Sequence, residues 1–154
     1  MGLKSVALLA HLAGVVVWVG GMFFAYLCLR PAVAEIEHAE VRLKLWLAVF
    51  QRFFRFVAAS VALILCSGFY LMFGSGPGPY PLHWHLMLGI GCVMAAIFVQ
   101  IAVGPFRRLG MAVTEQQWRD GAAALAGIRL RVAVNLSLGF LTVAIATVGP
   151  WVLD

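Results

Sequence analysis

Two of the four histidines lie inside long apolar stretches, where an ionisable side chain needs an explanation. Burying such a group in lipid costs free energy, so it is a candidate for function. His11 lies about six residues into the first stretch, roughly 9 Å along a helix, and His85 opens a later one. On facing helices of a bundle, two such histidines can hold a haem b iron between their imidazoles. The sequence therefore predicts His11 and His85 as metal ligands, with His83 as the alternative to His85.

The residues beside these histidines suit a flat cofactor. Gly14, Trp18 and Met22 follow His11 at intervals that keep them on one helix face, and Gly89 follows His85 by one turn. Small side chains leave room for a macrocycle, and an indole can line its pocket. We therefore predict that these four residues contribute to cofactor binding.

Helix packing offers an alternative interpretation of the same residues. Glycine and alanine also line the contacts between membrane helices. In that case His11 is a buried histidine hydrogen-bonded to Asn135, Ser67 or Tyr70. His85 is then an interfacial histidine in contact with water.

Sulfur-containing side chains support a second metal hypothesis. Thioethers and thiolates are soft ligands of the kind that hold Cu(I). The apolar stretches carry seven such residues: Met22, Met72, Met87, Met94, Cys28, Cys66 and Cys92. They form no M-x-x-M or C-x-x-C pair, and the cysteines also suit the role of small core residues. Copper binding is therefore the alternative to haem.

The elements that must position these residues are membrane-spanning helices. Hydrophobic residues make up 64% of the 154 residues and charged residues only 11%, whereas a soluble domain carries about 25% charged residues. Four stretches without Asp, Glu, Lys or Arg are each long enough to cross a bilayer; they are residues 5–29, 56–73, 84–106 and 132–153. The first is longer than the h-region of a secretory signal peptide, so we expect it to be retained. The sequence predicts an all-α four-helix bundle in one domain, residues 1–154.

The basic residues predict how this bundle is oriented. Of the eleven Lys and Arg residues, only Lys4 precedes the first stretch, and the other ten lie between stretches one and two or three and four. Cytoplasmic loops accumulate such charge. We therefore expect both termini outside a bacterial-type inner membrane. The net charge of +5 is then a topology signal, and it does not indicate a nucleic-acid partner.

The segments between the stretches differ in character. Residues 35–50 and 114–129 have helical composition and are expected to form short amphipathic helices or extensions of the spans. Thr114 followed by Gln117 fits a capping box, which predicts a helix start at Thr114. Residues 74–81 are rich in glycine and proline and predict an external loop.

Parts of the sequence resemble a known family. Residues 11–21, HLAGVVVWVGG, together with Arg30 and Pro31, resemble the first helix of the copper-resistance protein D (CopD) superfamily, which includes the HemJ-type membrane protoporphyrinogen oxidase. Residues 131–135, RVAVN, resemble the start of that group's last helix and add Asn135 to the candidate cofactor-binding residues. The similarity in hydropathy and helix order covers essentially the whole chain.

This resemblance implies a small helical inner-membrane protein. In the oxidase branch it also implies haem b, with His11 among the functional residues, and in the copper branch it implies copper transport. Leu136 stands where the oxidase pattern has an acidic residue, and the third stretch lacks the expected lysine. These departures argue against porphyrinogen oxidation and favour a second axial histidine.

Two functional hypotheses follow from the sequence. The leading one is a haem b-binding membrane protein that transfers electrons near the periplasmic face, with a quinone or a redox protein as partner. The alternative is a copper permease or other copper-handling protein without haem. A structural subunit whose activity resides in a partner is a third possibility. The sequence leaves open whether the chain is an enzyme and whether it forms a homo-oligomer.

Overall fold

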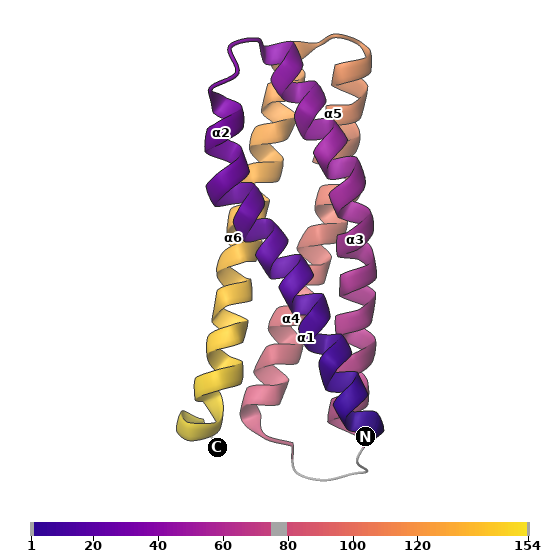
Figure 1. Cartoon of the computed structure of the whole chain (residues 1–154), viewed down its shortest axis with the longest axis vertical. Helices are drawn as coiled ribbons and strands as arrows, with labels where there is room; N and C mark the ends of the chain where they lie inside the picture. The colour runs from indigo at the N-terminus through magenta and orange to yellow at the C-terminus, as the bar shows by residue number, and fades with distance from the viewer. Residues whose placement is uncertain (1, 75–79, 154) are drawn as a thin grey trace.

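The structure, a computed structural model, describes residues 2–74 and 80–153, and the regular secondary structure within them is entirely helical (Figure 1). The first transmembrane rod is continuous and consists of α1 (Leu3–Phe23), the π-helix η1 (Phe24–Leu29) and α2 (Arg30–Ala34). The other helices are α3 (Ala39–Phe73), α4 (Leu82–Val103), α5 (Pro105–Thr114) and α6 (Trp118–Val152). The predicted all-α class is therefore confirmed.

Four helical segments are long and apolar enough to cross a membrane. They are Leu3–Ala34, Ala39–Phe73, Leu82–Thr114 and Trp118–Val152, each 32 to 35 residues long. The first three contain one predicted apolar stretch each, and the fourth contains all but the last residue of the stretch 132–153. All four segments also extend beyond the hydrocarbon thickness that about 20 residues cover, so their ends reach the polar layers on either side.

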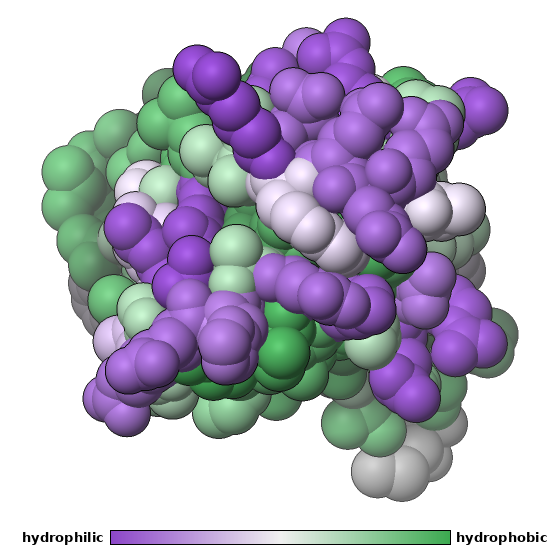
Figure 2. Space-filling model, turned by 90° about the horizontal axis from the view of Figure 1, so that it is seen from above, coloured by the Kyte–Doolittle hydropathy of each residue, from purple (hydrophilic) through white to green (hydrophobic). Residues whose placement is uncertain are grey.

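Neighbouring helices pair along the bundle (Figure 1). The first rod packs chiefly along α3, while α4 and α5 pack along α6. Both termini lie at one end of the bundle, which we call the terminal end. The opposite end, which we call the polar end, is largely covered by hydrophilic residues (Figure 2). The side of the membrane that each end faces remains a prediction.

Two clusters of buried side chains hold the bundle together. One lies near the polar end, and its largest members include Trp46, Phe50 and Leu109. The other cluster consists of Trp18, Met22, Val57, Met94 and Leu136. Most other large apolar side chains point outward, as expected where lipid rather than water covers the surface.

The connecting segments differ in part from the sequence predictions. Residues 39–50 extend the second span as one helix, α3. The predicted helix start at Thr114 is wrong, because Thr114 ends α5 and its hydroxyl donates to the Gly110 carbonyl at 3.0 Å. Pro105 at the first turn starts this helix earlier. The positive φ of Gln116, 58°, then ends the helical conformation before α6 begins. Of the predicted external loop, residues 75–79 lie outside the described residues.

The π-helix η1 directly precedes Pro31. The Arg30 N–H donates to the Ala25 carbonyl five residues earlier, so this turn is wider than an α-helical turn. Proline lacks an N–H, and its ring crowds the carbonyl four residues before it. The wider turn accommodates Pro31 without breaking the first rod.

Candidate functional site

His11 lies between α1 and α3 and is held by two groups of α3. Its Nδ1 is 3.1 Å from the Ile64 carbonyl oxygen and 3.1 Å from the Ser67 hydroxyl. A carbonyl oxygen only accepts hydrogen bonds, so this contact assigns the proton of the neutral ring to Nδ1. The lone pair is then on Nε2. Ser67 is one of the three partners expected if His11 is a packing histidine.

The residues that follow His11 on its face are also buried against neighbouring helices. A Cβ on Gly14 would lie 2.7 Å from Ile64 Cγ1, so glycine is what lets α1 approach α3 closely here. Trp18 is 4% exposed and meets the ring of Phe98 edge-on, with centroids 6.5 Å apart. Met22 is also buried. These three residues therefore share one buried face of the first span, as their spacing predicts, and cofactor binding by them stays a prediction.

On α4, it is His83 and not His85 that faces the inside of the bundle, and an exposed His85 agrees with the alternative of an interfacial histidine. His83 is buried, and a Cβ on Gly149 of α6 would lie 2.7 Å from the His83 Cβ. His85 is exposed, and its Nδ1 is 3.2 Å from the Pro81 carbonyl oxygen. Gly89 is exposed as well, with no heavy atom within 4 Å of an added Cβ. The face of α4 that carries His85 and Gly89 thus points out of the bundle.

The structure does not bring His11 and His85 together as a pair around one interior space. His11 makes its polar contacts on α3, and the exposed His85 contacts Tyr80 and the Pro81 carbonyl, just before its own helix. In the part of the chain that the structure describes, no group of three or more His, Cys, Asp or Glu side chains is placed to hold a metal ion.

Asn135 is the most deeply buried polar residue of the last span. Its side chain is 1% exposed, and its Nδ2 donates to the Met94 carbonyl at 3.2 Å. Its Oδ1 is buried without a hydrogen-bond partner in the structure. A buried amide oxygen without a partner is costly in a low-dielectric interior, so Asn135 leaves an acceptor available beside the buried cluster that contains Met22 and Met94.

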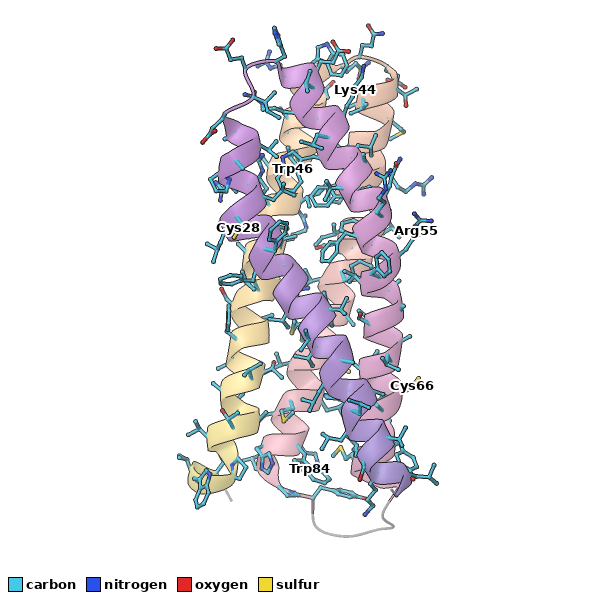
Figure 3. All side chains as sticks on the ribbon, in the orientation of Figure 1. Cys28, Lys44, Trp46, Arg55, Cys66 and Trp84 are labelled. Carbon is cyan, nitrogen blue, oxygen red and sulfur yellow. The ribbon has the colours of Figure 1, made fainter. Side chains whose placement is uncertain are left out.

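The sulfur-containing residues divide into an inner and an outer group. Met22 and Met94, each 3% exposed, lie in the same buried cluster, and Met72 is also buried. All three cysteines are free and exposed, and Cys66 points away from the bundle in Figure 3. Sequence reasoning missed this division. The placement of Met22 one turn beyond Trp18 was the available signal, because it put both on one face.

Comparison with known proteins identifies the family. The sequence pattern of Copper resistance protein D (CopD) matches residues 47–149, which is more than half of the chain. The chain belongs to the CopD family. Together with the four long apolar helices, CopD membership identifies a multi-pass membrane protein. No curated protein and no solved structure matches the chain.

Proposed function

We propose that this CopD-family protein handles copper within the membrane, with Cu(I) as its substrate and the thioethers of Met22 and Met94 as ligands. The observation that supports this proposal most strongly is the burial of both methionines in one cluster. They come from α1 and α4, which are far apart in the sequence. Thioether sulfur is a preferred ligand of Cu(I).

The surroundings of this methionine pair suit a cation that binds reversibly and is then released. The donors are neutral, and the four apolar stretches carry no carboxylate that would hold a metal permanently. The unpartnered Oδ1 of Asn135 adds a neutral oxygen beside Met94. Met72, in the last turn of α3 and nearer the terminal end of the bundle, is a further buried thioether. We place the copper path in the interior and not along the outward-facing cysteines.

Leucine variants test this proposal. Leucine replaces methionine with little change in volume, so M22L/M94L should fold while losing most of its Cu(I) binding. The measurement is competition with a chromogenic Cu(I) chelator under reducing conditions, using the full chain in detergent. The matched control is M111L on α5, where the side chain is 57% exposed. Cu(I) binding by M22L/M94L equal to that of wild type would contradict the methionine site.

A haem b remains the second candidate, because His11 and His85 each fit an axial ligand. In both residues, Nδ1 lies within hydrogen-bond distance of a backbone carbonyl, 3.1 Å and 3.2 Å away. Metal-binding histidines are commonly oriented in this way, with Nε2 left for the metal. When bound, such a haem supplies one-electron transfer, and a quinone or redox protein would be the partner. The two rings lie on different faces, so this proposal rests on the individual histidines.

The absorption spectrum of the purified protein tests the haem candidate. Haem b gives a Soret band, and H11A and H85A should each weaken it, because in this proposal each histidine acts as an axial ligand on its own. H83A should retain the band, because this side chain packs against Gly149. A protein that is colourless after expression with added haem rules out the haem candidate and leaves the copper proposal in place.

A further inference from the structure

Two hydrogen-bond donors are buried without acceptors near the polar end of the bundle. They are Nε1 of Trp46, on α3, and Nε of Arg129, on α6. Trp46 is 2% exposed and belongs to the buried cluster at this end, and Figure 3 shows it in the upper part of the bundle. The two side chains are neighbours, since the guanidinium carbon of Arg129 lies 5.6 Å from the centroid of the Trp46 ring. Each unpaired donor costs about 1–3 kcal/mol, which an acceptor at this position would recover.

The same place carries an excess of positive charge. The charges of Arg30 and Arg42 act on the guanidinium of Arg129. Arg30 stacks on Tyr26 at 4.9 Å, and Arg42 donates to the Ile36 carbonyl at 3.0 Å, so neither of these contacts supplies an anion. Within the described residues, the one ion pair joins Lys44 to Glu40. Arg129 is therefore repelled by both of these arginines, and no ion pair within the described residues offsets its charge.

We propose that Arg129 and Trp46, flanked by Arg30 and Arg42, form a binding site for a phosphate group. Guanidinium groups and an indole N–H all donate hydrogen bonds and accept none, and arginines recognise phosphate oxygens with paired N–H groups. A phosphate supplies several acceptor oxygens and negative charge at once. The site is at the end of the spans, the level at which lipid headgroups lie, and basic pockets between helices are known to bind anionic headgroups. This phosphate can belong to an anionic phospholipid or be free in solution.

The test measures phospholipid retained by the purified full chain, using native mass spectrometry with phosphatidylglycerol or phosphatidylcholine added to the detergent. Wild type should retain phosphatidylglycerol in preference to phosphatidylcholine. R129Q should lower that retention about tenfold, the effect expected for hydrogen bonds to a charged group. The matched control is R119Q, because Arg119 is on the same helix, is exposed and carries the same charge. Equal retention by R129Q and R119Q would overturn the site.

A second variant covers the case in which R129Q does not fold. W46F keeps an aromatic ring in the cluster and removes only the Nε1–H donor, so it should weaken phosphatidylglycerol retention about threefold. Unchanged retention in W46F would also overturn the site.

A further arm distinguishes the two sources of phosphate. Excess inorganic phosphate that displaces phosphatidylglycerol and raises the melting temperature of wild type, but not of W46F, assigns the site to a free phosphate. Retention of phosphatidylglycerol that phosphate does not affect assigns it to the lipid headgroup. Equal retention of both lipids by wild type, with no effect of phosphate, rejects the proposal.

Discussion

At Gly149, α6 packs closely against His83 of α4. An added Cβ would lie 2.7 Å from the His83 Cβ, an atom close to the backbone that cannot turn away. We expect G149A to destabilise the bundle by about 1–3 kcal/mol through overpacking. The measurement is thermal or denaturant unfolding in detergent micelles.

The matched control for G149A is G89A on α4. No heavy atom lies within 4 Å of the added Cβ at Gly89, and alanine favours a helix by roughly 1 kcal/mol over glycine. G89A should therefore be neutral or stabilising. A G149A variant as stable as G89A would show that α4 does not meet α6 in this way.

For single residues, the sequence predicted which side chains of the first span share a buried face. It did not predict which histidine of α4 points into the bundle. Trp18 and Met22 share the face of Gly14, and all three are buried. His83 and His85 are two positions apart, so at about 100° per residue they must lie on different faces. The α4 stretch is apolar on all sides, and nothing in its pattern distinguishes the lipid-facing side from the inner side. Only the packing of Gly149 against His83 decides between them.

Helix number and approximate extent followed from composition alone, because a run of about 20 apolar residues has one stable form in a bilayer. The ends of the helices were harder to predict. Thr114 has the residue type of a helix start but lies at a helix end, since Pro105 upstream and the positive φ of Gln116 downstream set the bounds of α5. A capping pattern of two residues is weak evidence beside these backbone constraints.

The candidate site depends on how the elements pair, and this could not be predicted from the separate spans. His11 and His85 were expected on facing helices. Instead, α1 packs chiefly along α3, and α4 packs along α6. The partner of His11 is therefore Ser67, which the sequence allowed as one of three. Met22 of α1 and Met94 of α4 meet instead in the cluster between the helix pairs, a relation between distant residues that no local pattern contains.

For the whole molecule, the distribution of basic residues predicts the orientation in the membrane. Only Lys4, of the eleven Lys and Arg residues, lies at the terminal end by its place in the sequence. Because cytoplasmic loops accumulate such residues, we expect the terminal end outside. In a variant whose native cysteines are replaced by alanine, a cysteine at position 75 should react with an impermeant maleimide in intact cells. Cysteines at positions 40 and 114 should react only after permeabilisation of the inner membrane.

The controls for this experiment are the cysteine-free parent, which should not react, and the same variants after detergent lysis, in which all three positions should react. Labelling of position 75 only after permeabilisation would reverse the orientation. It would leave the bundle and the buried methionines unchanged, since neither depends on the direction of insertion.

The outward placement of the three cysteines has a consequence for redox chemistry. A disulfide requires Cα atoms within about 7 Å, and Cys28 and Cys66 lie on opposite sides of the bundle at different heights (Figure 3). All three thiols are free and exposed. Cys28 and Cys66 of one chain therefore cannot reach each other, and a disulfide between these two positions has to join two chains. We therefore expect a Cys28–Cys66 disulfide, where one forms, to appear as a cross-linked dimer on a non-reducing gel and to disappear when reductant is added.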